Sequence, residues 1–529
     1  MGHPHNIKAD NKGAPSKGRR GPVVEPPFIL ALDIGSSSVK AMLFDVKAQP
    51  VMRVAARRTH ALHADSDGAA EEMVEHLVER VEEVLDEVLQ RAGAKAQHIA
   101  SVGLDTLAST VMGLNQDGQP ITAIYTYADT RSREDVRKLR QELDIPVTYQ
   151  RTGCPVHTAY LPARLLWLQR TCPDICSQVR RWVDIGTYLY MRWFGLRDAP
   201  VSYSIASWSG LLDRGRMQWD APLLGYLGLT VDALPKLADH TQTQRGLVAP
   251  FSRRWPSLRD VPFTLAVGDG FAANVGSGCV SARQIALTVG TSGAMRILLP
   301  DPAPAVQQGL WAYRVDTEHT LVGGSLSEGG NVFDWASKTL RLPPVKHMTS
   351  ALRALPPDGH GLTMLPFLAG ERSPGWSTAT GGILAGLKMS TTAVELLQAF
   401  LEGVAYRFGL VAEALNGYGN TPLTTIVSGG ALMRSPYWVQ VLADVLQRPL
   451  VLSGEAEATS RGVAILALRS LKLWQAFDSV PALHGDIYEP DHARSMVYQA
   501  AIQRQRRLYE TFIGHDDQDA LGAAAMVIG

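Results

Sequence analysis

The 529-residue sequence contains little cysteine. Its four cysteines, at positions 154, 172, 176 and 279, are too few and too scattered for a disulfide framework. Cys172 and Cys176 lack the second pair of ligands that a zinc site needs. Few, dispersed cysteines are typical of a reducing compartment, so we expect a cytoplasmic protein.

The sequence also lacks an excess of charge of either sign. Lys and Arg number 51 and Asp and Glu number 51, so the formal net charge is zero. This balance argues against nucleic acid or an anionic membrane surface as a partner. No apolar run approaches the ~18 residues needed to span a bilayer. The length is sufficient for two or more globular domains.

Both ends of the chain have compositions that are typical of flexible segments. Residues 1–27 are rich in Gly, Pro, Lys and Arg and contain no apolar stretch of the kind found in secretory signals. We therefore predict a disordered extension over 1–27 and a flexible tail over 513–529.

Two segments 255 positions apart, 28–44 and 284–299, share one pattern. Each has an apolar strand, a turn rich in Gly and hydroxyl residues, and a second apolar strand, which predicts a β-hairpin. The matched positions are Asp33 with Thr288, Gly35 with Gly290, and Ser36-Ser37 with Thr291-Ser292. Such a turn can direct N–H and O–H groups toward phosphate oxygens, although a single copy is more often a plain turn. Two matched copies predict two related domains that hold one polyphosphate across a cleft.

The rest of the sequence alternates between helical and strand patterns. Apolar residues at helical spacing between Glu71 and Leu89 predict a helix, and short apolar runs predict strands at 99–104, 111–114 and 263–267. This alternation indicates an α/β architecture. Most of the aromatic residues of the helical stretches within 150–260 are assigned to the core.

Two predicted strands end in glycine-rich segments. Strand 263–267 runs into Gly268-Asp269-Gly270, and strand 424–427 runs into Ser428-Gly429-Gly430-Ala431. A helix is predicted after the second segment, with Ser435 as N-cap and Pro436 at N1. Ligands of open α/β sheets bind at the carboxyl ends of strands, so both segments are candidate binding sites.

Taken in order, these motifs resemble those of the FGGY family of carbohydrate kinases, within the actin/hexokinase/Hsp70-type ATPase superfamily. The similar segments are the first phosphate motif at 33–40, the catalytic aspartate at 268–270, the second phosphate motif at 288–293, the adenosine motif at 428–431, and the family signatures at 160–167 and 382–402. The resemblance covers about 28–512. It implies two actin-like (ribonuclease H-like) α/β ATPase domains, over 28–280 and 281–512, around a central nucleotide cleft.

The resemblance also implies the cofactors ATP and Mg²⁺ and assigns roles to two carboxylates. Asp269 is the expected general base; the structural alternative is a helix N-cap. Asp33 is the expected Mg²⁺ residue, and the alternative is an Asx-turn that closes the hairpin.

The nucleotide is expected to contact both halves of the chain. The expected phosphate-binding residues are Gly35, Ser36, Ser37, Ser38, Lys40, Gly290, Thr291 and Ser292. The residues expected beside adenosine are Gly330, Gly429, Gly430, Ala431 and Arg434. Lys40 lies in a predicted strand, so a simply solvated lysine is an equal alternative. Arg434 departs from the Asn of related glycerol kinases.

Within the family, the passages 126–132, 152–157, 203–212 and 370–376 are most similar to gluconokinases. A sugar acid would need an Arg fork for its carboxylate. The candidate acceptor residues are Leu107, Ala108, Asp129, Arg131, His157 and Arg372. A surface ion pair between Asp129 and Arg131 is the alternative for those two. Tyr127 replaces the usual Trp, and Leu107-Ala108 replaces a Met-His pair that contacts the sugar in many members, so the acceptor is less certain than the reaction class.

The sequence therefore predicts an ATP-dependent kinase for a sugar or sugar acid, with gluconate favoured and 6-phosphogluconate as its product. A pentulose kinase of the xylulokinase type is the alternative within the family. An actin-like ATPase that is not a kinase and an inactive metabolite-binding member are the alternatives outside it. The expected partner is a small molecule, and a homodimer is left open.

Overall fold

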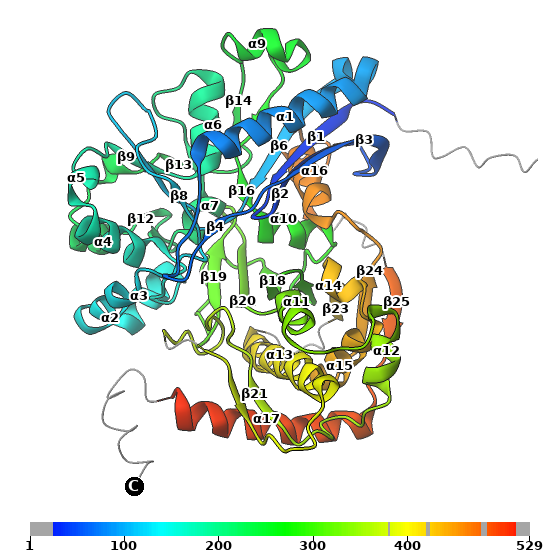
Figure 1. Ribbon diagram of the computed structural model, residues 1–529. Coiled ribbons are helices and arrows are strands. Elements are labelled where there is room, and N and C mark those ends of the chain that lie inside the picture. The colour runs from blue at the N-terminus through cyan, green and yellow to red at the C-terminus, as the bar shows by residue number, and fades with distance from the viewer. Residues whose placement is uncertain (1–24, 379–380, 419–423, 478–483, 515–529) are drawn as a thin grey trace, which may run out of the picture.

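The computed structural model describes residues 25–378, 381–418, 424–477 and 484–514 and contains two lobes, each built on a mixed β-sheet (Figure 1). The extension predicted over 1–27 lies outside the described residues up to position 24, and the predicted tail lies outside them from 515 onward. Ile513 is buried against Leu365 and Phe367, so the prediction of a flexible tail is wrong at this residue.

The sheet of the first lobe has the strand order β14-β15-β6-β1-β2-β3, and β16 also pairs with β6. Its strands are β1 (Phe28–Ile34), β2 (Ser38–Phe44), β3 (Pro50–Thr59), β6 (Ile99–Thr106), β14 (Thr243–Gln244), β15 (Phe263–Thr264) and β16 (Val267–Gly268). Strand β1 is antiparallel to β2 and parallel to β6. The strand predicted at 263–267 is thus two short strands rather than one.

The sheet of the second lobe has the order β19-β20-β18-β17-β23-β24-β25. Its strands are β17 (Gln284–Val289), β18 (Gly293–Leu299), β19 (Trp311–Arg314), β20 (Thr320–Leu326), β23 (Thr424–Ser428), β24 (Leu450–Ser453) and β25 (His484–Tyr488). Strand β17 is antiparallel to β18 and parallel to β23, as β1 is to β2 and β6. Both predicted hairpins are confirmed, and each lies beside a parallel strand in the same arrangement.

Helices flank the two sheets (Figure 1). The longer ones are α1 (Val74–Ala92), α2 (Arg133–Glu142), α4 (Leu161–Thr171), α6 (Ile185–Phe194), α11 (Gly330–Thr339), α12 (Val345–Arg353), α13 (Ala393–Leu415), α15 (Pro436–Leu446) and α17 (His492–Phe512). Helix α1 packs on β2 and β3, α2 and α4 pack on each other to one side of the sheets, and α13 packs on α15, α17 and β20. The helix predicted from Glu71 starts later because Ala70–Glu72 forms β5, which pairs with β8 (Ile124–Tyr125). Within the described ranges, no helix has the length and apolarity needed to cross a membrane.

Two helices, α10 (Asp269–Gly276) and α16 (Ala458–Ser470), lie where the lobes meet (Figure 1). Helix α16 comes from the second half of the sequence but packs on β1 and β6 of the first sheet. The two helices cross at glycines: a Cβ on Gly276 would lie 1.7 Å from Ala458 O, and one on Gly462 would lie 1.8 Å from Ala272 O. Their backbones are therefore in direct contact at this crossing.

Candidate active site

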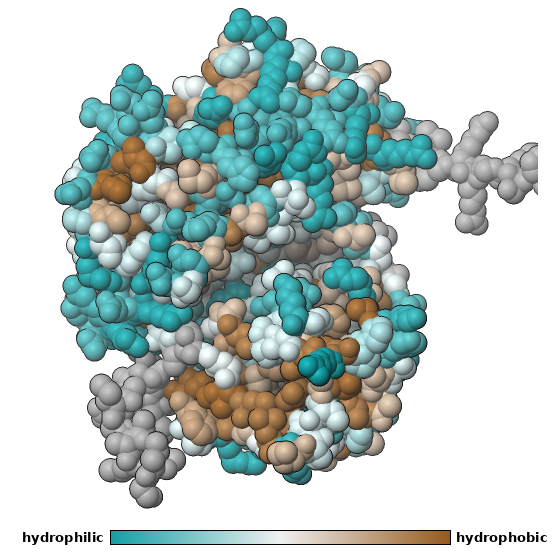
Figure 2. Space-filling model, in the orientation of Figure 1, coloured by the Kyte–Doolittle hydropathy of each residue, from teal (hydrophilic) through white to brown (hydrophobic). Residues whose placement is uncertain are grey.

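The tips of the two hairpins line one cavity of about 530 Å³. The eight residues predicted to bind phosphate all line it, as do Asp33 and Asp269. The space-filling view shows the hollow between the upper and lower lobes (Figure 2). The matched turns, which are distant in the sequence, therefore face one common space.

His60, at the end of β3, holds the first turn in place. Its backbone N donates a hydrogen bond to Ser37 O at 3.1 Å, and its ring Nε2 lies 2.9 Å from Gly35 O. Its Nδ1 lies 3.0 Å from the Glu72 carboxylate. Both ring nitrogens therefore face oxygen atoms, a backbone carbonyl on one side and a carboxylate on the other. Nothing in the sequence patterns considered above marks this residue.

The start of α11 holds the second turn. Gly330 N donates to Gly290 O at 2.8 Å, and Asn331 N donates to Thr291 O at 3.2 Å. A Cβ on Gly330 would lie 3.0 Å from the Cβ of Ala431, so this predicted adenosine-side pair is in contact.

The other predicted adenosine-side residues belong to the short helix α14 (Gly430–Met433) or its ends: Gly429 is the N-cap, Gly430 the first residue and Arg434 the C-cap. A Cβ on Gly429 would lie 2.5 Å from Val289 O, so this residue approaches the end of β17 closely. Arg434 is exposed at the C-terminal end of α14. The prediction of Ser435 as the N-cap of α15 is confirmed, since its side chain accepts from Trp438 N.

Asp269 is the first residue of α10, and Gly268 is the N-cap. Its Oδ1 accepts from Gly270 N at 2.7 Å. Burial raises its pKa, while the positive charges of Arg296 and Arg372 oppose that shift. Because Gly268 is the N-cap of α10, the alternative of an N-cap role for Asp269 is wrong. The flanking glycines are needed because Trp208 packs on them: a Cβ would lie 2.9 Å from its ring at Gly268 and 2.8 Å at Gly270.

Two further carboxylates lie near Asp269. Burial raises the pKa of Asp33 to about 6; Lys40 opposes this shift, and repulsion from Asp269 adds to it. Burial also raises the pKa of Asp105 well above its ordinary value, with repulsion from Asp33 and Asp269. Lys40 binds Asp33 at 3.7 Å and Glu457 at 3.0 Å, so it is an ion-pair partner rather than a simply solvated lysine. Asp105 was not among the predicted site residues.

Cationic side chains line the cavity from both lobes, Lys40 and Arg57 from the first and Arg296 and Arg372 from the second. Arg296, on β18, is buried beneath the second turn, and its Nη1 donates to Thr288 Oγ1 at 3.3 Å. Its Nε has no hydrogen-bond partner among the described residues. Arg372 lines the same cavity and lies over the Tyr127 ring at 5.4 Å. Arg372 was predicted, whereas Arg296 was read only as part of a strand.

Aromatic side chains form one wall of the cavity. Tyr313 stacks on both Trp208 and Trp311, with ring centroids 4.3 and 4.2 Å away, and the two tryptophan rings lie 5.5 Å from each other. The Tyr313 hydroxyl lies 2.6 Å from that of Tyr160. All four residues line the cavity. Tyr160 is buried in the hydrophobic core, as expected, and also lines the cavity, whereas Trp208 is only partly buried against that core.

The predicted Leu107-Ala108 pair is divided between the core and the cavity. Ala108 lines the cavity, whereas Leu107 is packed in the hydrophobic core of the first lobe. Leu107 is thus not among the residues that line either compartment of the cleft.

A second compartment of about 430 Å³ adjoins the first and shares Tyr127, Arg372 and the tips of both hairpins. His157 lines it, and burial lowers the pKa of His157 to about 3, so the ring is neutral. Its Nδ1 accepts from Ala159 N at 3.1 Å. The proton therefore lies on Nε2, which makes that atom a donor.

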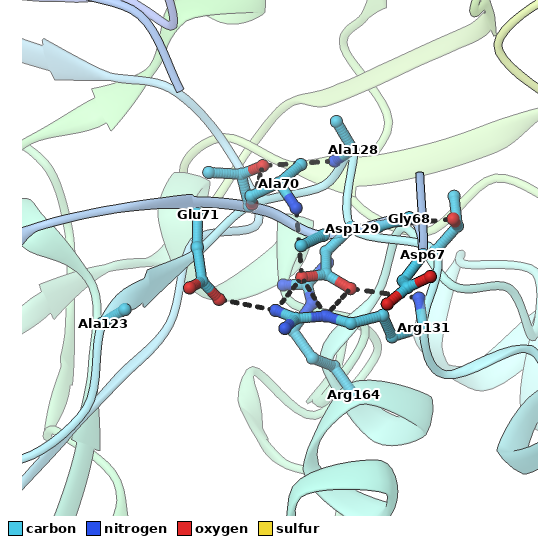
Figure 3. Close-up of polar contacts among 12 residues, drawn as sticks. Asp67, Gly68, Ala70, Glu71, Ala123, Ala128, Asp129, Arg131 and Arg164 are labelled. Atoms are coloured by element: carbon cyan, nitrogen blue, oxygen red, sulfur yellow. Dashed lines mark hydrogen bonds and ion pairs between the residues drawn. The ribbon is translucent and has the colours of Figure 1, made fainter. Parts of the chain in front are cut away.

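Asp129 and Arg131 bind each other rather than lining either compartment (Figure 3). Asp129 is 1% exposed and also accepts from Ala70 N at 3.3 Å. Arg131 binds Glu71 at 2.6 Å and lies over the Trp167 ring at 4.4 Å. The structure therefore favours the ion-pair alternative for these two residues, with the pair partly buried rather than on the surface.

Asp358, His360 and Glu402 lie close enough together outside the cleft to be potential metal ligands. Both ring nitrogens of the histidine already have hydrogen-bond partners. His360 Nδ1 accepts from Leu362 N at 2.9 Å, and its Nε2 lies 3.0 Å from Glu402. Nε2 therefore carries the proton and has no lone pair for a metal.

Comparison with known proteins gives matches along most of the chain. The family model "FGGY family of carbohydrate kinases, N-terminal domain" matches residues 28–276, and the model for the C-terminal domain of the same family matches residues 285–471. A gluconokinase of Bacillus subtilis (strain 168) is 27% identical over 472 residues, which cover 87% of this chain and 91% of the relative.

Two solved structures have the same overall fold. A gluconate kinase from Lactobacillus acidophilus superposes with a TM-score of 0.85 at 24% identity, covering 95% of this chain and all of the other. A ligand-bound xylulose kinase from the same organism also has a TM-score of 0.85, at 25% identity, covering 94% of this chain and 99% of the other. These matches support the predicted fold class of two α/β domains.

Proposed function

Because the chain belongs to the FGGY family of carbohydrate kinases, we propose that this ATP-dependent sugar kinase phosphorylates gluconate to 6-phosphogluconate. The observation that carries the proposal is a cavity that combines a partly buried carboxylate, Asp269, with cationic side chains facing it from the opposite lobe. The carboxylate suits the transfer of a phosphoryl group to a hydroxyl, and the cations suit an acidic acceptor.

Asp269 serves as the general base in this proposal. Its carboxylate accepts the proton of the attacking hydroxyl as the γ-phosphoryl group is transferred. The hydrogen bond from Gly270 N fixes one carboxyl oxygen, which leaves the other for the acceptor hydroxyl. Trp208 covers the backbone on both sides of Asp269 and helps to exclude water.

The two turns would hold the triphosphate of ATP. Backbone N–H and hydroxyl groups at Ser36, Ser37, Thr291 and Ser292 face the shared cavity from opposite lobes. The carboxylates near the first turn fit a divalent cation, because Asp33 lines the cavity beside it. Mg²⁺ bound there would neutralise phosphate charge during the transfer.

The second compartment favours an acceptor with a carboxylate. Arg372 and Arg133 line it beside the neutral ring of His157. Glu371 also lines it, but its carboxylate is bound by Arg407 and Tyr509. The compartment therefore presents net positive charge, which a sugar acid would balance and a neutral sugar would not.

An ADP-release screen over gluconate, xylulose, glycerol and glucitol tests the proposal. Glucitol is the matched control because it has the carbon chain and hydroxyl groups of gluconate without the carboxylate. We expect the highest kcat/KM for gluconate and a preference of at least tenfold over glucitol. Arg372→Met should remove most of that preference by raising the KM for gluconate alone, since a charge-assisted hydrogen bond contributes about 1.5–3 kcal/mol.

Xylulose is the second candidate acceptor, favoured by the aromatic wall and by the fold shared with the Lactobacillus xylulose kinase. Stacked aromatic rings bind the apolar face of a neutral sugar and need no cation. A higher kcat/KM for xylulose than for gluconate would overturn the gluconate assignment but not the assignment as a sugar kinase. ADP release with none of the acceptors would favour an inactive, metabolite-binding member.

A further inference from the structure

The cleft segment, residues 369–378, lines the second compartment but has no regular secondary structure. Six of its residues line that compartment, and one of them, Arg372, lines the first compartment as well. The segment lies between β21 (Thr363–Leu365) and β22 (Ile383–Ala385) and contains neither helix nor strand. Because no regular pattern of backbone hydrogen bonds fixes it, its shape depends on contacts with side chains.

Glu371 closes the cleft segment on itself and binds it to two helices of the second lobe. The side chain is 2% exposed, and its carboxylate accepts from Ser377 N at 3.2 Å within the segment. The same carboxylate forms an ion pair with Arg407 on α13 and accepts from the Tyr509 hydroxyl on α17 at 2.7 Å. The carboxylate that orders the segment is therefore itself held by donors from outside it.

The Tyr509 hydroxyl also lies directly against the backbone of the cleft segment. A Cβ on Gly375 would lie 1.9 Å from this hydroxyl, so no side chain fits between the two. The guanidinium of Arg407 lies 5.0 Å from the Tyr509 ring and 5.0 Å from the ring of Phe367. Tyr509 thus contacts the segment, its buried carboxylate and the cation that neutralises this carboxylate.

Helix α17 lies outside the residues that the family models match, which end at 471. It packs on α13 and α15 at the base of the second lobe (Figure 1). Earlier in the helix, Tyr498 donates to Glu402 at 3.2 Å, and neither of these residues lines a compartment of the cleft. Tyr498 therefore holds the helix on the lobe, whereas Tyr509 contacts a segment that lines the cleft.

We propose that Tyr509 is a positioning residue for acceptor binding: through Glu371 it holds the cleft segment in the shape that presents Arg372 to the acceptor. The inference rests on the proposed function in that the acceptor occupies the second compartment, and it holds whichever sugar is phosphorylated. A segment that is ordered before the acceptor binds lowers the entropic cost of binding. Loss of the hydroxyl should weaken acceptor binding and spare the nucleotide, because His60 and α11 hold the phosphate turns.

The test is Tyr509→Phe, which removes the hydroxyl and keeps the ring beside Arg407. We expect the KM for gluconate to rise about tenfold, near the lower end of what a hydrogen bond to a charged group contributes, while kcat and the KM for ATP stay within about twofold. In the unliganded protein, hydrogen exchange of the backbone amides of 369–378 should become about fivefold faster, because local opening of the segment becomes easier.

Tyr498→Phe is the matched control. It removes the same group from the same helix, and that hydroxyl also donates to a buried carboxylate, Glu402. Both variants lose one such hydrogen bond, so we expect similar decreases in melting temperature. The KM for gluconate and the exchange of the cleft segment should change in Tyr509→Phe and not in the control.

A KM for gluconate in Tyr509→Phe within about twofold of the wild type would overturn the proposal, and so would equal rises of the KM in both variants. If Tyr509→Phe does not fold, hydrogen exchange of the wild type decides the question. Because coupling between two sites is reciprocal, bound gluconate should slow exchange in residues 508–512 as well as in 369–378, and unchanged exchange in 508–512 would refute the proposal.

Failure of the gluconate assignment is distinguishable from failure of this proposal. If the wild type releases ADP with xylulose and not with gluconate, the acceptor assignment fails, and the same KM comparison is made with xylulose. The exchange of the unliganded cleft segment depends on neither acceptor. Equal exchange of that segment in Tyr509→Phe and in the wild type would therefore refute the positioning role whichever sugar is the acceptor.

Discussion

Replacement of Asp269 by Asn tests the assignment of the general base. The amide keeps the shape of the side chain and can still accept from Gly270 N, but it cannot take a proton from the acceptor. General-base catalysis typically contributes ~10²–10⁴-fold, which corresponds to about 3–5 kcal/mol of transition-state stabilisation. We therefore expect kcat to fall by about that factor, while the affinity for ATP stays within about threefold.

The structure also predicts the effect of this substitution on stability. Gly268, not Asp269, is the N-cap of α10, so no helix cap is lost. Burial raises the pKa of Asp269, which means that the folded protein binds its proton more tightly than the unfolded chain does. The ionised side chain therefore lowers stability as the pH rises above the ordinary Asp range, and a neutral amide removes that effect. We expect an unchanged or higher melting temperature at pH 7.

The assay combines steady-state kinetics with thermal melting, and Asp184→Asn is the control. Asp184 likewise follows a short strand and precedes a helix, but it lies outside both compartments and its side chain caps α6 by accepting from Thr187 N. Its replacement should leave kcat within about twofold, because Asn is also a good N-cap. Retention of more than a tenth of kcat by Asp269→Asn, or an early melting transition without a kinetic defect, would refute the assignment of Asp269 as the base.

Three further predictions follow from the contacts in the cleft. His157→Gln should reduce the loss of stability between pH 7 and pH 5 by about 2 kcal/mol. A buried His with a pKa of about 3 stays neutral in the folded protein over this range, whereas the same His in the unfolded chain takes up a proton as the pH falls through about 6.5. The same change in the urea-unfolding free energy between pH 7 and pH 5 in both proteins would contradict it. Gly270→Ala should destabilise the protein by about 1–3 kcal/mol in thermal melts, since its Cβ would lie 2.8 Å from the Trp208 ring; a full-stability variant would show that the ring moves freely. His60→Leu should raise the KM for ATP about tenfold through loss of the bond to Gly35 O and leave the KM for the acceptor unchanged; equal changes in both constants would indicate general loosening instead.

The hairpins and the strand-end aspartate could be predicted because their signals are local. A glycine and hydroxyl turn between two apolar strands specifies a hairpin wherever it occurs, and two matched copies specify related lobes. Gly268-Asp269-Gly270 was recognised by the same local pattern, although the reason for its glycines, the packing of Trp208, is a long-range contact.

The missed residues depend on contacts between distant parts of the chain. The aromatic residues of 150–260, most of which were expected in the core, include Tyr160 and Trp208, which line the cavity. Helical spacing shows that one face of a helix is covered, but not whether a cavity borders it. Arg296 lies in an apolar strand whose neighbours are buried, and its role emerges only once β18 is placed across from Asp269. Arg131 failed as an acceptor candidate for the converse reason, because Glu71 and Trp167 come from other elements and occupy it.

The division of charge between the lobes connects the fold to the proposed chemistry. Three carboxylates, Asp33, Asp105 and Asp269, belong to the first sheet or the helix that follows it, whereas Arg296 and Arg372 come from the second half of the chain. The close crossing of α10 and α16 fixes these carboxylates relative to one another, since α10 begins at Asp269, the proposed base, and α16 packs on β1 and β6, which carry the other two. The proposed base and the acidic pair thus lie on one side of the cleft and the two arginines on the other, where a metal–nucleotide complex and an acidic acceptor would compensate the charge of both sides.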